Sequence, residues 1–64
     1  MPTGVLSVTV VGADLGTADA YATAAFARGR GGPAWTLTLT GYEAMTILPD
    51  HTVLLTPGFP VLAA

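Results

Sequence analysis

An acidic residue and a hydroxyl residue lie one helical turn apart in the segment TADAYATAAF, residues 17–26. If this alanine-rich segment is helical, Asp19 and Thr23 stand at positions i and i+4 and share one face. The backbone carbonyl of Ala22 comes close to the same side. Carboxylate, hydroxyl and carbonyl oxygens are ligands that a hard cation such as Mg²⁺ accepts. Asp19, Ala22 and Thr23 are therefore the candidate metal ligands.

The same pattern also has an ordinary structural explanation. An acid near the start of a helix is stabilised by the helix dipole, and a threonine inside a helix often donates to a backbone carbonyl. Mg²⁺ sites have no fixed ligand spacing along the sequence, so the spacing alone does not separate the two explanations. Both stay open at this level.

The other polar residues give weaker candidates. His51 follows a turn aspartate and has no cysteine or second histidine with which to chelate a metal, so we expect a solvated turn histidine. Arg28 and Arg30 flank Gly29 after the helix, whereas phosphate-binding glycine loops precede one. No arrangement of serine, histidine and aspartate indicates nucleophilic catalysis. We therefore name no catalytic residue.

The composition is that of a protein core with little surface of its own. The 64 residues are 52% hydrophobic and 9% charged, against about 25% charged in an ordinary soluble domain. No stretch approaches the roughly 20 apolar residues of a membrane span, so we expect no membrane segment. The net charge of −2, without lysine, argues against a nucleic-acid partner. The composition therefore favours a piece of a larger protein that covers these apolar faces.

The first half of the chain predicts a strand and a helix. VLSVTVV, residues 5–11, is apolar and β-branched on both faces, which indicates a strand covered on both sides, in the middle of a sheet. Thr17 is the expected N-cap of a helix from Ala18 to Arg28, and Gly29 is expected to end it. The glycine-rich stretch 29–33 is expected to be a flexible exit that does not continue as helix.

The second half predicts three strands. AWTLTLT, residues 34–40, alternates apolar residues with threonines, a pattern typical of a half-buried strand. Residues 42–48 and 52–56 predict a β-hairpin with Pro49 and Asp50 in its turn. PGFP is expected to stop the last strand, with VLAA, residues 61–64, as a tail. The expected fold is therefore α+β, in the order strand, helix, strand, strand, strand.

The run TGVLSVTVVGADLGTADAYATAAFARG, residues 3–29, resembles the C-terminal region of the FAD:protein FMN transferases. These form the ApbE family, once called thiamine biosynthesis lipoproteins. In that family an SVTVVG-type strand leads into a helix that opens with an ADALATA-like motif. GYEAMTILPDHTVLLTPGF, residues 41–59, resembles the closing hairpin of actinobacterial-type members. The resemblance covers nearly all of this chain but only a C-terminal part of a family member.

The resemblance implies a metal site and a reaction. At the matching positions, Asp19 gives a carboxylate, Ala22 a backbone carbonyl and Thr23 a hydroxyl to Mg²⁺. Family members use this ion to hold the pyrophosphate of FAD, and they transfer FMN to a threonine or serine of an acceptor flavoprotein, releasing AMP. The chain departs from the family at Tyr21, where leucine is usual, and at His51, where glycine commonly follows the turn aspartate. Neither departure touches an implied ligand.

The resemblance also implies partners. Residues 1–64 would complete the sheet of a larger ApbE-like, T-fold-like domain, whose missing N-terminal part carries the FAD pocket, so the chain alone is expected to be inactive. Relatives often work at the outer face of the cytoplasmic membrane or in the periplasm, but no secretory signal is recognisable here and the compartment stays open. The competing hypothesis is a small non-enzymatic, β-rich interaction module in which Asp19 and Thr23 only shape the helix.

Overall fold

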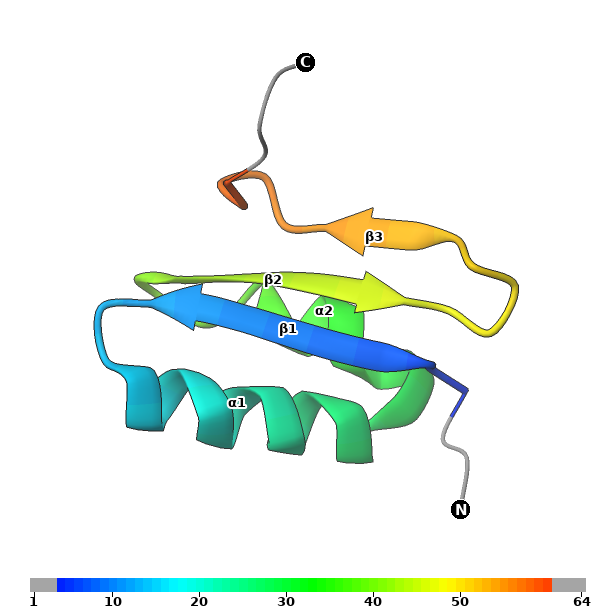
Figure 1. Ribbon diagram of the computed structural model, residues 1–64, viewed down its shortest axis with the longest axis horizontal. Helices are drawn as coiled ribbons and strands as arrows, with labels where there is room; N and C mark the ends of the chain where they lie inside the picture. Colours follow the sequence, from blue (N-terminus) through cyan, green and yellow to red (C-terminus); the bar gives the residue numbers. More distant parts are fainter. Residues whose placement is uncertain (1–3, 61–64) are drawn as a thin grey trace.

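The computed structural model describes residues 4–60 and confirms the α+β class. Three strands form an antiparallel sheet in the order β1-β2-β3, and the helices precede the last two strands along the chain (Figure 1). The elements are β1 (Ser7–Gly12), α1 (Leu15–Ala27), the 3₁₀ helix η1 (Gly29–Gly31), α2 (Gly32–Thr36), β2 (Tyr42–Ile47) and β3 (Val53–Leu55).

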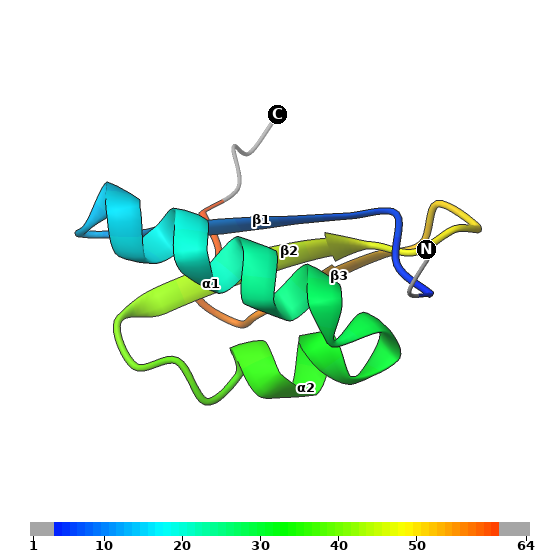
Figure 2. The same cartoon turned by 90° about the horizontal axis from the view of Figure 1, so that it is seen from below.

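The central strand β2 carries the buried centre of the sheet. Ala44 and Thr46 are each 2% exposed, and the register places them opposite Val10 and Val8 of β1. Residues directly opposite each other in an antiparallel pair project to the same face. The helices cover this face: α1 lies along β1 and α2 lies behind β2 (Figures 1 and 2).

Helix α1 begins earlier than the sequence pattern predicts. The N-cap is Asp14, whose Oδ2 accepts a hydrogen bond from the backbone N–H of Thr17 at 2.7 Å. The prediction that Thr17 is the N-cap is therefore wrong, because the aspartate three residues before it already satisfies that N–H. The expected end is confirmed: Gly29 follows the helix with φ +61°, the left-handed conformation that favours glycine.

The predictions for residues 29–40 are wrong. The glycine-rich stretch continues as η1 and α2, and the expected strand over residues 34–40 is replaced by α2 and the turn that follows it. The alternating threonines suggested a strand, but two of them bond within the helical segment. Thr36 Oγ1 donates to the carbonyl of Pro33 at 2.7 Å, and Thr38 Oγ1 donates to that of Trp35 at 2.7 Å. These local bonds stabilise a helical turn, and Pro33 suits a helix start because its missing N–H is not needed there.

Strand β1 is not the central, doubly covered strand that its composition predicts. It lies at one edge of the sheet, with Leu6 just before it 52% exposed and Thr9 exposed. Only one of its faces is turned to the helices. The apolar residues on both faces predicted packing on both sides of β1, but within residues 4–60 no helix or strand packs on its second face.

The hairpin prediction is confirmed. Strands β2 and β3 pair antiparallel, with Met45 opposite Leu55. In the turn, the N–H of His51 donates to the carbonyl of Leu48 at 2.8 Å, and Asp50 Oδ1 accepts from the N–H of Thr52 at 2.9 Å. His51 is exposed, as expected, and has φ +70°. The predicted tail, residues 61–64, lies outside the described residues.

An aromatic cluster joins α1, α2 and β2. The ring of Tyr21 makes edge-to-face contacts with Trp35 at 5.9 Å and with Tyr42 at 5.1 Å between centroids. The guanidinium of Arg28 lies 4.4 Å from the centre of the Trp35 ring. One ring, that of Tyr21, therefore contacts both α2 and the sheet.

Candidate functional site

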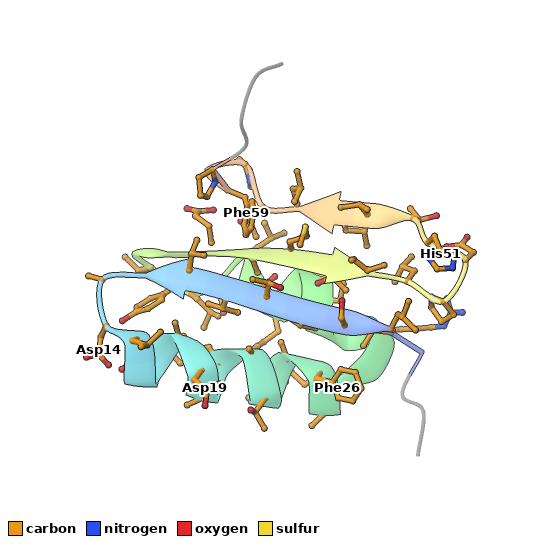
Figure 3. The ribbon with its side chains drawn as sticks, viewed as in Figure 1. Asp14, Asp19, Phe26, His51 and Phe59 are labelled. Carbon is orange, nitrogen blue, oxygen red and sulfur yellow. The ribbon has the colours of Figure 1, made fainter. Side chains whose placement is uncertain are left out.

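The three candidate metal ligands line one depression between α1 and β1. Asp19, Ala22 and Thr23 come from α1, and the depression has a volume of about 410 Å³. Its other lining residues are Leu6, Ser7, Val8 and Phe26. Figure 3 shows Asp19 and Phe26 along α1, with Asp14 at the turn before the helix. The helical spacing predicted this shared face correctly.

The oxygens of this site already take part in helical bonding. Thr23 Oγ1 donates to the backbone carbonyl of Asp19 at 3.2 Å, which is the ordinary role of a threonine inside a helix. A hydroxyl that donates one bond keeps its lone pairs for a cation. The carbonyl of Ala22 lies inside α1, where a helical carbonyl accepts one bond and keeps a second lone pair. The carboxylate of Asp19 lies on the exposed surface.

These donors fit a hard cation in chemical type but provide a single negative charge. Among residues 4–60 there is no group of three or more histidine, cysteine, aspartate or glutamate residues that could hold a metal. One carboxylate and two neutral oxygens make a weak site, because Mg²⁺ binding in proteins usually depends on carboxylates together with water and substrate phosphates. The depression therefore fits one side of a Mg²⁺ site.

Asp14, not Asp19, is the acid that stabilises the helix start. The hydroxyl of Thr17, followed by its backbone N–H, holds the pKa of Asp14 below its usual value. The first turn of α1 contains no acidic residue, so Asp19 lies beyond the turn in which the dipole acts most strongly. The place at the helix start that could have explained Asp19 is therefore occupied by Asp14.

The two arginines do not converge on one site. Arg28 lies over the Trp35 ring, whereas Arg30 runs beside Gly4, close enough that a Cβ there would lie 2.8 Å from its Cγ. His51 stands in the hairpin turn, and Figure 3 shows it at the opposite end of the molecule from Asp14. No cradle for a phosphate forms between these side chains in the part of the chain that the structure describes.

A polar cluster at the end of β3 was missed by the sequence analysis. Thr56 is 7% exposed; its hydroxyl accepts from the N–H of Ala44 at 2.9 Å and donates to Glu43. The same Glu43 oxygen accepts from the N–H of Gly58 at 3.1 Å. Glu43 and Thr56 are 13 residues apart, and only the strand register brings them together. No local sequence signal marks this pair.

Comparison with known proteins gives no family assignment. No family model matches the sequence, and no curated protein or solved structure matches it. Separately, none of the helices within residues 4–60 has the length and apolar character needed to cross a membrane. The role of the α1–β1 depression therefore depends on its chemistry and on the resemblance of its motif.

Proposed function

We propose that this chain supplies the magnesium-holding helix of an FAD:protein FMN transferase. The observation that supports the proposal best is the position of Asp19, Ala22 and Thr23, which line one depression beside β1. In the family that the motif resembles, these positions are the ligands of the Mg²⁺ that holds the FAD pyrophosphate. The reaction class is the transfer of FMN from FAD to a threonine or serine of an acceptor flavoprotein.

The proposed roles follow from the chemistry of each group. Asp19 provides the charge that attracts the cation, and the Ala22 carbonyl and Thr23 hydroxyl provide neutral oxygens. The bond from Thr23 to the Asp19 carbonyl orients the hydroxyl along the helix. A bound Mg²⁺ would neutralise negative charge on the phosphates of FAD. In that family the FAD pocket is formed by segments other than the one that this chain resembles, so we expect these 64 residues alone not to catalyse.

The metal site is tested with Mn²⁺, a paramagnetic substitute for Mg²⁺, in amide NMR spectra of the 64-residue chain. We expect broadening centred on residues 19–23, and we expect Asp19→Asn to remove it. The matched control is Asp50→Asn, which removes the same charge from the exposed hairpin turn and should leave the broadening at α1 unchanged. Broadening that is confined to Asp14 or Asp50, or that survives Asp19→Asn, contradicts the ligand role.

The reaction is tested separately. Incubated with FAD, Mg²⁺ and a threonine-containing acceptor peptide, the 64-residue chain should transfer no flavin, and transfer by this chain alone would refute the proposed division of labour. In a full-length transferase with the same motif, replacing the aspartate that matches Asp19 by asparagine should sharply reduce Mg²⁺-dependent flavin transfer. Unchanged activity there would refute the role of this aspartate.

A small interaction module is the second candidate. The exposure of all three residues of β3 favours it: Val53 is 51%, Leu54 39% and Leu55 45% exposed. Apolar side chains gathered on one edge often mark a contact surface. The two candidates make different predictions, because a module gives no specific Mn²⁺ response at α1 and remains a well-folded monomer. The transferase fragment instead responds to Mn²⁺ and associates through its uncovered strands.

A further inference from the structure

The outer edge of β3 carries backbone groups that no strand of residues 4–60 pairs. On the inner side, the N–H of Thr56, just after β3, donates to the carbonyl of Ala44 at 3.0 Å. The backbone groups of successive residues in a strand point to opposite sides, so those of Leu54 also point toward β2. The N–H and carbonyl groups of Val53 and Leu55 therefore point outward, away from the sheet.

The two edges of the sheet differ in protection. Natural sheets protect an edge with a helix, a charged side chain, a proline or a bulge, because unpaired backbone groups bind other strands. At the β1 edge, α1 runs along the strand (Figure 1). At the β3 edge, residues 52–56, TVLLT, contain no charge and no proline, and the register of β3 with β2 is continuous. The β3 edge is therefore open to a further strand.

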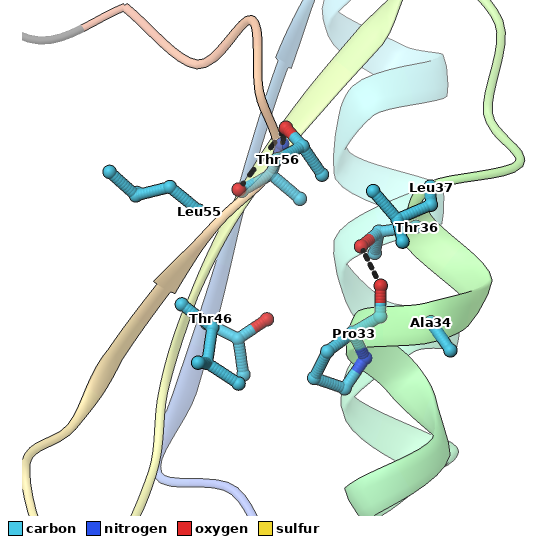
Figure 4. Close-up of a pocket in the computed structure, with 9 residues that line it drawn as sticks. Pro33, Ala34, Thr36, Leu37, Thr46, Leu55 and Thr56 are labelled. Carbon is cyan, nitrogen blue, oxygen red and sulfur yellow. Dashed lines mark hydrogen bonds between the residues drawn. The ribbon is translucent and has the colours of Figure 1, made fainter.

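Both faces of this edge are apolar. Val53 and Leu55 share the face away from the helices, because side chains alternate along a strand. Figure 4 shows the Leu55 side chain pointing away from α2. On the helix side, Leu54 lines an apolar hollow of about 330 Å³ beside α2, together with Leu37, which is 64% exposed. A strand added at this edge would bury apolar area on both faces.

We propose that a second copy of this chain pairs with β3, antiparallel and about a two-fold axis at Leu54. In this register Val53 of each copy lies opposite Leu55 of the other, and the two residues exchange both of their outward hydrogen bonds. Leu54 lies opposite Leu54 of the second copy in a position without hydrogen bonds between the two. Such a contact uses the same surface on both copies, so the assembly closes as a dimer.

The symmetric register suits a second copy because it brings only neutral residues together. Residues 52–56 of one copy face residues 56–52 of the other, so no like charges meet along the paired strands. The axis also places the two apolar hollows on the same side of the joined sheet. Leu37 and Leu54 of both copies then lie in the space between the two α2 helices.

The size of the contact sets its strength. A standard interface has about 20 to 30 residues a side, and this edge is a short strand with a few neighbours, so we expect a weak dimer with a Kd of about 10 μM to 1 mM. The dimer uses no residue of the α1–β1 depression. It therefore stands independently of the proposed metal site, and the Mn²⁺ response and the dimer can each fail without the other.

The unmodified chain gives the first test. Sedimentation equilibrium from about 10 μM to about 1 mM should show a monomer–dimer equilibrium, and dilution should shift the amide NMR signals of residues 52–56 most. A chain that stays monomeric to about 1 mM overturns the proposal and leaves the edge to a strand of another protein. Species larger than a dimer overturn the closed two-fold pairing.

Single cysteines test the register, because the chain has no cysteine of its own. Across the axis the two copies of residue 54 have Cα atoms about 4.5 Å apart, which suits a disulfide, so Leu54→Cys should cross-link under mild oxidation. Val53→Cys and Leu55→Cys are the matched controls, since each lies about 8 Å from its own counterpart and should cross-link at least about tenfold less. A mixture of the two controls should cross-link. Equal cross-linking of all three single variants, or none in the mixture, overturns the register.

A proline tests the outward hydrogen bonds. Leu55→Pro removes an N–H that points away from β2, so the hairpin keeps its own bonds while each copy loses one donor to the other. The Kd of the dimer should weaken at least about tenfold. Leu55→Val is the control, because it keeps the N–H and an apolar side chain, and it should weaken the dimer much less. A well-folded Leu55→Pro that dimerises like the unmodified chain overturns the proposal.

Discussion

The two edges of the sheet differ in what lies beside them. Along β1, helix α1 packs closely through small side chains, with Ala18 3% and Ala25 0% exposed. Beyond β3, no further strand of residues 4–60 extends the sheet, and every residue of β3 is exposed. Both strands are rich in valine or leucine. Apolar composition therefore indicates which strands can pack against another element, whereas the path of the chain decides which strand a helix packs along.

The two halves are also held together by different interactions. On the helical side, α1 and α2 approach at a glycine: a Cβ on Gly32 would lie 2.5 Å from the carbonyl oxygen of Ala25. On the hairpin side, the end of β3 is fixed by the hydroxyl of Thr56 and the carboxylate of Glu43. Steric fit stabilises the first half and hydrogen bonds stabilise the second, and substitutions can test each separately.

The largest effect is expected at the contact between the two helices. Gly32→Ala places a methyl group against backbone that cannot turn aside, so it should lower the free energy of unfolding by about 1 to 3 kcal/mol, measured by urea denaturation. Gly31→Ala is the matched control, because nothing lies within 4 Å of its Cβ position and its φ is −79°. The control should be neutral or stabilise by about 0.5 kcal/mol. If the two variants had equal effects, the close contact at Gly32 would not be what stabilises the helical half.

The next effect is expected at the end of the hairpin. Thr56→Val keeps the shape of the side chain but leaves the N–H of the buried Ala44 without its acceptor, which should cost about 1 to 3 kcal/mol of stability. Thr52→Val is the control, because Thr52 is exposed and its hydroxyl meets only the exposed carboxylate of Asp50, so its loss leaves no buried group without a partner. Thermal unfolding followed by circular dichroism compares the two. A loss at Thr52 as large as that at Thr56 would contradict the role of the hydroxyl.

The smallest effect is a dependence on pH that both halves share. The pKa of Asp14 is lowered by the hydroxyl and N–H of Thr17, and that of Asp50 by the N–H and hydroxyl of Thr52. A carboxyl whose pKa is lower in the folded state stabilises the fold above its unfolded pKa, and this contribution is lost as the pH falls through the folded pKa. Stability should therefore decrease below about pH 4, measured as the urea midpoint between about pH 2 and pH 7.

Two variants show how much of this loss of stability at low pH comes from each half of the molecule. Asp14→Asn keeps a side-chain oxygen at the helix cap, and Asp50→Asn keeps one in the turn, but neither can titrate. Each should flatten part of the acid response, and the double variant should flatten more than either alone. Because both carboxyls are exposed, we expect each contribution to be small. An acid response that is unchanged in the double variant would place its origin elsewhere.

One physical reason separates the elements that the sequence predicts correctly from those that it does not. The hairpin was predictable because Pro49 and Asp50 carry their turn chemistry with them, and the end of α1 was predictable because glycine at position 29 readily adopts positive φ. Residues 34–40 were not, because threonine next to leucine suits a strand, while the same hydroxyls can bond carbonyls three residues back. A local pattern fails to predict the structure where the same side chains suit both a strand and a helical turn.

The candidate sites divide in the same way. Asp19, Ala22 and Thr23 lie on one helix, so their 3.6-residue period alone places them on one face, and the sequence determined that geometry. Glu43 lies on β2 and Thr56 directly follows β3, and their contact exists only because β2 and β3 pair in one register. The packing of α2 against β2 depends further on a helix that the sequence pattern did not indicate. Sequence thus determined what local bonding could fix, and the tertiary structure decided every contact between segments distant along the chain, because those depend on the packing of the whole sheet.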